Sequence, residues 1–581
     1  MNTKRSLTPF KAPFSLFSRG ATILYSLIFL AFGLYRAFYP SLHMDEGYYL
    51  GAALRILKGD LFLTGYAFDK IPLAPYLMIP GILIAGENPL GFHLSGLIAS
   101  WVGFLSALGL ITRLCRSWLA TLVAQFFYLL LNLLPFMVFQ HGSSLTDPFL
   151  LMFLLLFLSA AQRCLSDANE ITRRRYENHA YHFFSLALAT KFQALMWLPC
   201  LLGFWFLRFG VAEKKAWLGT SFLRLWKVLR WYAALALVFM LTSPTKFAPI
   251  SWFSHLFRKE TKSTDNSLLS IFWTRSFEWL QTAQTVLGAS WVSWIFVSLA
   301  IFISVRLMVR AKRSGLKRKE LTSDMILTGL VVIPFWCYAG GLVLSGATVF
   351  SRYLYCLTPL FVLLLIAGFP GRERVFRPSR WKFYERIAYM GLLGIGAYGL
   401  LSEAGSLPKQ KAFMISETLP PETGRLFFKI RDQLPRGSWI HNESRLWWLH
   451  PFTLAANLRP SCMEDRCYQE AQIGRCPFDK QFRLMEMGDG HVELEQALPQ
   501  TCPGPGHPPL AAQQKRLGDL SMFSVLNENL LRSALRIGPW AESVTWKTGA
   551  CQNCPSPSEE TCTTHQSCAL HWQRVPSGLV L

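Results

Sequence analysis

The sequence predicts an all-α polytopic membrane domain of about eleven transmembrane helices, followed by a small disulfide-rich extracytoplasmic domain. Its composition, 52% hydrophobic and only 16% charged, is too apolar for ordinary soluble domains. Apolar runs close to the roughly 20 residues that a membrane span requires recur along the first two thirds of the chain. Beyond them the chain becomes polar and rich in cysteine. We therefore expect a membrane domain over residues 1–402 and an exported domain over residues 403–581.

The apolar runs give the expected spans. They are residues 20–39, 90–112, 118–135, 147–163, a pair at 180–191 and 192–208 that turns at Lys191, then 230–250, 285–307, 323–346, 353–369 and 384–402. The first run follows Lys4 and Arg5, and no small-residue cleavage site follows Tyr39. It is therefore expected to be a retained anchor that leaves the N-terminus in the cytoplasm.

Positive charge is distributed unevenly among the loops. A net charge of +23 would suggest nucleic acid binding in a soluble protein, but here the basic residues fall in alternate loops, which the positive-inside rule places in the cytoplasm. These residues are Arg113 and Arg116; Arg173, Arg174 and Arg175; Lys214, Lys215, Arg224, Lys227 and Arg230; Arg310, Lys312, Arg313, Lys317, Arg318 and Lys319; and Arg372, Arg374, Arg377, Arg380 and Lys382. The lipid bilayer is thus an expected partner and nucleic acid is not. The opposite-side segments 40–89, 136–146 and 347–352 hold most groups suited to chemistry, and an odd number of spans places the tail on their side.

The tail contains eight of the thirteen cysteines: Cys462, Cys467, Cys476, Cys502, Cys551, Cys554, Cys562 and Cys568. An even cluster in an exported domain indicates disulfide bonds. A zinc site is the alternative, since Cys551 and Cys554 form a C-x-x-C pair followed by His565. An oxidising compartment disfavours free thiolates, so disulfides are the favoured interpretation and no pairing is assigned.

Two adjacent carboxylates, Asp45 and Glu46, follow the first span. A carboxylate at the edge of a low-dielectric region is costly unless it is paired or solvated, and it can accept a proton or bind a metal. A solvated helix start is the alternative, because acidic residues are favourable in a first helical turn. Spacing alone does not decide between a catalytic pair and a helix start.

Other charged residues are expected on the same side of the membrane. Lys70 precedes a proline-broken apolar stretch that suggests an interfacial or re-entrant segment, where the lysine could meet a phosphate or serve as an anchor. Thr146 or Asp147 could cap a helix that has Pro148 at its first position, and capping does not exclude that Asp147 faces a site. Lys191 and Arg352 are outward-facing cations, and a guanidinium suits bidentate phosphate binding, although both could be interface anchors.

As an ordered series, these motifs resemble the GT-C class of membrane glycosyltransferases, in particular the protein O-mannosyltransferase and aminoarabinose transferase group. The matching residues are Asp45, Glu46 and Tyr49; Lys70, Pro72 and Leu73; Asp147 and Pro148; Thr190 and Lys191; and Arg352, Tyr353 and Pro359. The likeness covers roughly residues 20–370. Ile71 stands where that group usually has proline, Phe192 where it has glycine and His93 where it often has arginine, and the tail matches no part of the pattern.

The resemblance implies transfer of a sugar from a polyprenyl-phosphate donor to an acceptor hydroxyl of a protein, lipid or glycan on the non-cytoplasmic face, usually with inversion. Asp45 would be the general base, with Glu46 orienting it or binding the acceptor. Lys70, Lys191 and Arg352 would bind the donor phosphate. Asp147 and Tyr49 would bind the acceptor, or Asp147 a divalent cation such as Mg²⁺ or Mn²⁺; no cofactor is required, because cationic side chains already serve the leaving phosphate.

Two other classes fit a protein with about eleven spans. A secondary transporter or lipid flippase is one, although such proteins usually show internal repeats and polar groups at the membrane midplane. A surface-glycan polymerase or ligase is the other. Short loops and compact termini favour a bacterial inner membrane, with the site and the tail facing the periplasm.

Overall fold

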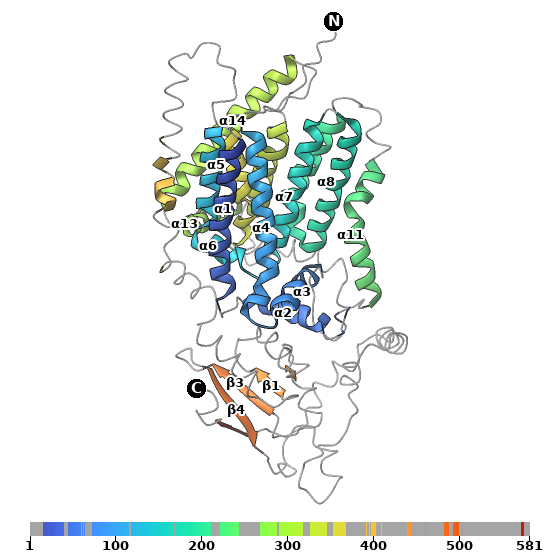
Figure 1. The fold of residues 1–581 in the computed structure, drawn as a ribbon, viewed down its shortest axis with the longest axis vertical. Coiled ribbons are helices and arrows are strands. Elements are labelled where there is room, and N and C mark those ends of the chain that lie inside the picture. The colour runs from blue at the N-terminus through green and yellow to red at the C-terminus, as the bar shows by residue number, and fades with distance from the viewer. Residues whose placement is uncertain are drawn as a thin grey trace, which may run out of the picture.

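The computed structural model of the chain is mostly helical (Figure 1). It describes residues 15–39, 44–57, 73–115, 118–167, 169–210, 221–242, 268–287, 290–317, 326–344 and 352–367, with isolated positions at 59, 61 and 63, short pieces between 391 and 408, and short strands in the tail. Statements about the structure refer to these residues.

Three long apolar helices pack side by side, with α4 (Pro89–Leu114) in contact with both α1 (Ser15–Ala37) and α7 (Asp147–Ser166). Within the described residues, these three are long and apolar enough to cross a membrane, which agrees with three of the expected spans. The helix pair α5 (Trp118–Asn132) and α6 (Pro135–His141) could supply a fourth span, bent by 83°. The total of about eleven spans stays a prediction.

The bend between α5 and α6 has a local cause. Pro135 occupies the first position of α6, where its missing N–H costs nothing, and the preceding Leu134 is extended at φ −59° and ψ 144°. Apolar residues of α6, including Phe136 and Phe139, are buried. The segment 136–146, predicted on the side opposite the basic loops, therefore begins with a short apolar helix.

Two short helices, α2 (Met44–Leu57) and α3 (Leu73–Ala85), lie at one end of α4 (Figure 1). Pro80 interrupts the hydrogen bonding of α3, and Ser95 of α4 compensates: its Oγ accepts from the Gly81 amide at 2.8 Å and donates to the Met78 carbonyl at 3.1 Å. The stretch expected to be interfacial or re-entrant is thus a helix fixed against α4.

Helix α8 (Glu170–Thr190) begins ten residues before the expected span at 180–191. Asn169 caps it by accepting from the Ile171 amide at 2.9 Å, and Glu170 pairs with Arg173 and Arg174 in its first turns. Placing Arg173–Arg175 in a loop was wrong, because these polar interactions extend the helix beyond its apolar part. The expected break at Lys191 is confirmed, since α8 ends at Thr190.

The remaining helices complete the bundle. They are η1 (Phe192–Trp197), α9 (Leu198–Trp205), η2 (Phe206–Gly210), α11 (Ser221–Thr242), α13 (Leu268–Leu287), α14 (Ser290–Lys317), η3 (Thr328–Val332), α16 (Ile333–Leu344), α17 (Arg352–Tyr355) and α18 (Thr358–Ala367). Helix α11 lies nearer the N-terminus than the expected span 230–250. The expected span 192–208, which follows Lys191, is a series of short helical segments. Helix α9 packs closely on η3, because a Cβ at Gly203 would lie 2.4 Å from the Gly329 carbonyl oxygen.

The tail contributes a mixed sheet with strand order β2-β1-β3-β4-β5. The strands are β1 (Trp439–Asn442), β2 (Arg459–Pro460), β3 (Gln481–Glu486), β4 (Val492–Leu498) and β5 (His571–Arg574). Strand β1 pairs in parallel with β2 and β3, whereas β3, β4 and β5 are antiparallel. In Figure 1 these strands lie beyond α2 and α3, away from the start of α1. The tail cysteines predicted to form disulfides lie outside the described residues.

Candidate active site

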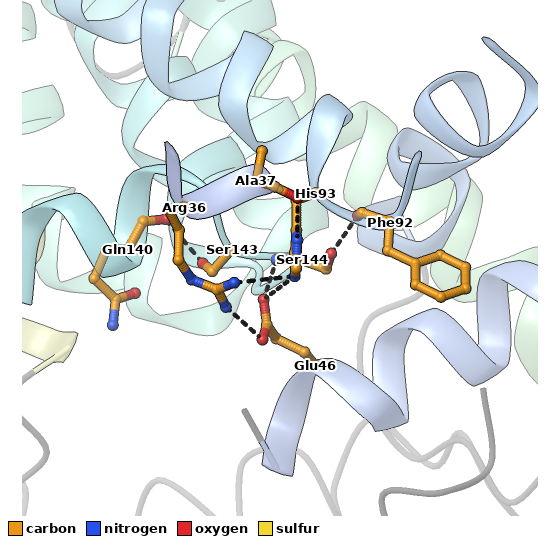
Figure 2. A network of polar contacts seen from close by, with 8 residues as sticks. All are labelled: Arg36, Ala37, Glu46, Phe92, His93, Gln140, Ser143 and Ser144. Carbon is orange, nitrogen blue, oxygen red and sulfur yellow. Dashed lines mark hydrogen bonds and ion pairs between the residues drawn. The ribbon is translucent and has the colours of Figure 1, made fainter. Parts of the chain in front are cut away.

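Glu46 is completely buried in a network of polar contacts (Figure 2). Its Oε2 lies 3.0 Å from Nη2 of Arg36, and its Oε1 accepts from the Ser144 amide at 2.6 Å. Nε2 of His93 lies 3.4 Å from the same Oε1. Arg36 and His93 are also fully buried, so the charge of this carboxylate is neutralised inside the protein.

The network joins α2 to three other parts of the fold. Arg36 belongs to the last turn of α1, His93 to α4, and Ser144 to the loop that leads into α7. His93 is itself held by its Nδ1, 3.1 Å from the Ala37 carbonyl oxygen. Arg36 was absent from the predicted site, although its place as the one basic residue in the last turn of the first span was a usable signal.

The loop at residues 142–146 packs closely against the helices around it. A Cβ at Gly142 would lie 2.6 Å from Cγ of Arg36, and one at Gly96 would lie 2.0 Å from the Ser143 carbonyl oxygen. Ser143 Oγ donates to the Gln140 carbonyl at 2.8 Å, and Ser144 Oγ donates to the Phe92 carbonyl (Figure 2). The backbone that leads to Asp147 is therefore fixed by α1, α4 and α6.

Two further predicted residues lie on α2. Asp45 directly precedes Glu46 in the helix, and its side chain lies outside the described residues. Tyr49 follows one turn later and belongs to the hydrophobic core, with 9% of its surface exposed. Helix α2 thus carries all three residues of the first predicted motif in its first two turns.

Asp147 forms an ion pair with Lys191. Nζ of Lys191 lies 2.8 Å from Oδ1 and 3.0 Å from Oδ2 of Asp147. The carboxylate is 1% exposed, whereas the lysine side chain is 19% exposed. Two residues predicted to act separately, one on acceptor or metal and one on phosphate, are therefore direct partners.

Asp147 and Lys191 both lie at the ends of helices. Asp147 is the first residue of α7, and Thr146 stands at the N-cap position without a side-chain capping hydrogen bond. Lys191 has extended backbone angles, φ −159° and ψ 137°, between α8 and η1. Helices α7 and α8 pack against each other, and the ion pair joins the start of α7 to the end of α8. The expected capping role of Thr146 is correct in position but not in hydrogen bonding.

Arg352 begins the short helix α17, and its side chain lies outside the described residues. Tyr355, one turn later, is fully buried; its hydroxyl lies 2.9 Å from Nδ1 of His141 and 3.3 Å from Oγ of Ser100. Helix α17 contacts α6 and α7, so the turn carrying Arg352 lies beside these elements. Sequence reasoning missed Tyr355 and His141, because neither stands in a charged motif.

The structure brings most of the predicted motifs to one end of the bundle. Helix α2 is tied to the loop before Asp147, Asp147 binds Lys191, and α17 packs on α6 and α7. Lys70 lies outside the described residues, but α3 begins at Leu73, three positions later, and packs against α2 and α4. At the opposite end of α7, Arg113 donates to Gln162 at 2.8 Å.

The described part of the chain contains no group of three or more His, Cys, Asp and Glu side chains suited to hold a metal ion. Among the described cysteines, Cys115, Cys164, Cys200, Cys337 and Cys356 are free thiols. The divalent cation therefore stays a prediction.

Comparison with known proteins identifies the architecture. No protein-family model matches the sequence, and no curated protein matches it. The apo crystal structure of ArnT from Cupriavidus metallidurans matches with a TM-score of 0.53 over 78% of this chain and 87% of that chain, at 14% identity. The chain has a GT-C fold.

Two other solved structures match the chain. ArnT bound to undecaprenyl phosphate matches with a TM-score of 0.50 at 14% identity, over 77% of this chain and 87% of that chain. An Archaeoglobus fulgidus oligosaccharyltransferase, crystallised with Zn and sulfate, matches with a TM-score of 0.41 at 14% identity, over 76% of this chain and 62% of that chain. The matches to the two ArnT structures confirm, for the fold, the resemblance predicted from the ordered motifs.

Proposed function

We propose that this protein is an integral membrane glycosyltransferase that moves a sugar from a polyprenyl-phosphate donor to an acceptor hydroxyl on the non-cytoplasmic face. The observation that carries this proposal is the meeting of α2, the Asp147–Lys191 pair and α17 at one end of a GT-C fold. One of the matching ArnT structures holds undecaprenyl phosphate, which supports a lipid phosphate as the donor carrier.

In this proposal Asp45 is the general base. Its carboxylate takes the proton from the acceptor hydroxyl as the oxygen attacks the anomeric carbon. The bond from that carbon to the phosphate oxygen breaks, and the lipid phosphate departs with the electron pair. Attack opposite the leaving group inverts the anomeric carbon.

In this proposal Glu46 positions helix α2, which carries Asp45. Both of its carboxylate oxygens already interact with protein donors, Arg36 on one side and the Ser144 amide on the other. A fully buried carboxylate held in this way does not reach an acceptor unless the network opens. Successive helical residues are rotated by about 100°, so Asp45 and Glu46 occupy different faces of α2. The buried network of Glu46 thereby fixes the helix that carries the base.

Cationic residues complete the proposed site. Lys70 and Arg352 bind the donor phosphate and stabilise the charge that develops on it. Lys191 contributes a third positive charge, and Asp147 holds its ammonium in place. The acceptor-binding role predicted for Asp147 and Tyr49 stays a prediction, because Asp147 is paired with Lys191 and Tyr49 belongs to the hydrophobic core. A divalent cation bound by Asp147 would have to displace Lys191 from both oxygens, so loss of transfer on chelation, restored by Mg²⁺ or Mn²⁺, would revise the role of this pair.

The proposal includes a membrane topology. We propose a membrane domain over residues 1–402 and an extracytoplasmic domain over residues 403–581, in a bacterial inner membrane. The site end of the bundle, where Asp147 and Lys191 meet, faces the periplasm. The end that carries Arg113 and Arg173 faces the cytoplasm, as the positive-inside rule requires.

Transfer of a radiolabelled sugar from a purified polyprenyl-phosphate donor tests the proposal. Asp45→Asn and Arg352→Ala should each lower turnover by at least about 100-fold, in the range of a lost general base or charge stabiliser. Arg174→Ala is the matched control, because Arg174 is 77% exposed on α8 at the other end of the bundle. Wild-type turnover in both site variants would refute the assignment.

The alternative classes predict different bound lipids. Mass spectrometry of lipid copurified with the protein should find a monophosphate sugar for the proposed transferase. A diphosphate oligosaccharide would indicate a surface-glycan polymerase or ligase, and lipid transport without sugar transfer would indicate a flippase. The GT-C similarity of the fold favours the transferase.

A further inference from the structure

The hydroxyl of Tyr355 joins three parts of the chain that are distant in sequence. Tyr355 belongs to α17, His141 ends α6, and Ser100 lies in the middle of α4. The hydroxyl lies 2.9 Å from Nδ1 of His141 and 3.3 Å from Oγ of Ser100. All three side chains are at most 5% exposed, so water does not compete for these hydrogen bonds.

Aromatic rings also pack against His141 and Tyr355. The ring of Phe29 lies 4.4 Å from the ring of His141, and the His141 ring lies 5.4 Å from that of Tyr355 in an edge-on arrangement. Phe29 in turn stacks on Phe104 at 4.3 Å. The imidazole is therefore fixed by packing, and it presents its Nδ1 to Tyr355 in one orientation.

Helix α17 is too short for its own backbone hydrogen bonds to fix its orientation in the fold. It contains four residues, Arg352–Tyr355, and the chain continues through a turn in which the Leu357 amide donates to the Leu354 carbonyl at 3.0 Å. Its position therefore depends on what it contacts, and the bonds of Tyr355 to His141 and Ser100 are buried side-chain contacts of this helix. Arg352 begins the turn that Tyr355 ends, so the backbone position of Arg352 depends on where Tyr355 is held.

We propose that Tyr355 is a positioning residue for Arg352: its hydroxyl locks α17 against α4 and α6 and thereby sets the arginine at the donor phosphate. This inference rests on the proposed function, because it takes Arg352 as a phosphate-binding residue. A displacement of about 1 Å in such a group costs on the order of 100-fold in rate, so a locked turn matters at this position. Tyr355 acts through Arg352 and does not touch the substrate.

Binding of undecaprenyl phosphate to the purified full-length protein, followed by tryptophan fluorescence, tests this inference without requiring turnover. Tyr355→Phe keeps the buried ring and removes only the hydroxyl. We expect its Kd to rise about five- to tenfold, the effect of one lost buried hydrogen bond. In an Arg352→Ala background, Tyr355→Phe should change the Kd by less than about twofold, because coupled residues are not additive.

Tyr181→Phe is the matched control. Tyr181 is also fully buried, and its hydroxyl donates at 3.1 Å to Glu177 within α8. A general effect of losing a buried hydroxyl would appear in both variants, whereas the proposal expects wild-type binding for Tyr181→Phe. If Tyr355→Phe does not fold, Ser100→Ala removes one partner of the same hydroxyl and should weaken binding in the same direction.

The outcomes separate this inference from the proposed function. Absence of undecaprenyl phosphate binding in the wild-type protein would overturn the proposed donor class, and this inference with it. Wild-type binding in both Tyr355→Phe and Ser100→Ala, or a full additive loss in the Arg352→Ala background, would overturn the positioning role alone.

Discussion

Lys191 and Asp147 are 44 positions apart in the sequence, yet Nζ of Lys191 lies within 3.0 Å of both carboxylate oxygens of Asp147. This ion pair connects the start of α7 to the end of α8 at the proposed active site. It supplies a positive charge whose position is set by a buried partner. Its contribution to stability and its contribution to transfer can be measured separately.

Asp147→Asn should lower both stability and activity. Removing one member of a largely buried pair leaves the other uncompensated, at a cost of up to about 3–5 kcal/mol. The double variant Asp147→Asn/Lys191→Gln should recover part of the lost stability, because no unpaired charge remains, while transfer stays low. Thermal unfolding in detergent and sugar-transfer assays check the two effects. Recovery of transfer in the double variant would contradict a role of the ammonium at the phosphate.

Glu46→Gln should destabilise the protein strongly. The change leaves the buried Arg36 without its carboxylate partner, which costs about 3–5 kcal/mol for pairs of this kind. Glu170→Gln is the matched control: the Glu170 side chain is 44% exposed, so the loss of its pairs with Arg173, Arg174 and Arg208 should cost about 1 kcal/mol or less. Chemical unfolding of the two variants gives the comparison, and equal midpoints would show that the Glu46 network does not hold α2.

Gly96→Ala should displace the loop before Asp147. The new Cβ would meet the Ser143 carbonyl oxygen at 2.0 Å, and backbone must move to relieve this contact, at about 1–3 kcal/mol. Gly109→Ala, on the same helix α4, is the control because the atom nearest to its new Cβ would be Nη1 of Arg113 at 3.5 Å. That substitution should be neutral or stabilising by about 0.5–1 kcal/mol, as for glycine to alanine inside helices. Comparable melting temperatures for the two variants would argue against close packing of the loop on α4.

Thiol labelling separates the cysteines of the two predicted domains. Iodoacetamide applied to the denatured, unreduced protein should modify Cys115, Cys164, Cys200, Cys337 and Cys356, the free thiols among the described residues. The eight tail cysteines should become reactive only after reduction, if they form disulfides as predicted. Peptide mass spectrometry reads both groups. Tail cysteines that label without reduction but are protected by zinc would favour the metal site.

Some of the architecture could be predicted from local sequence. The apolar runs indicated α1, α4 and α7 because a lipid-facing helix must be apolar along its length, and that property is visible residue by residue. The break at Lys191 was visible for the same reason, as a charge between two apolar stretches. Local sequence indicated α8 less well, because capping by Asn169 and the ion pairs of Glu170 extend the helix into a polar region.

The sequence by itself determined the membrane class, the main apolar helices and the order of the charged motifs, since hydrophobicity and charge are properties of each residue and its neighbours. Tertiary structure decided which of those charges are partners. Glu46 interacts with Arg36 and Ser144. Asp147 forms an ion pair with Lys191. The hydroxyl of Tyr355 contacts His141 and Ser100. Such pairs join residues that are far apart along the chain, and only the packing of α1, α4, α6, α7 and α17 brings them within hydrogen-bond distance.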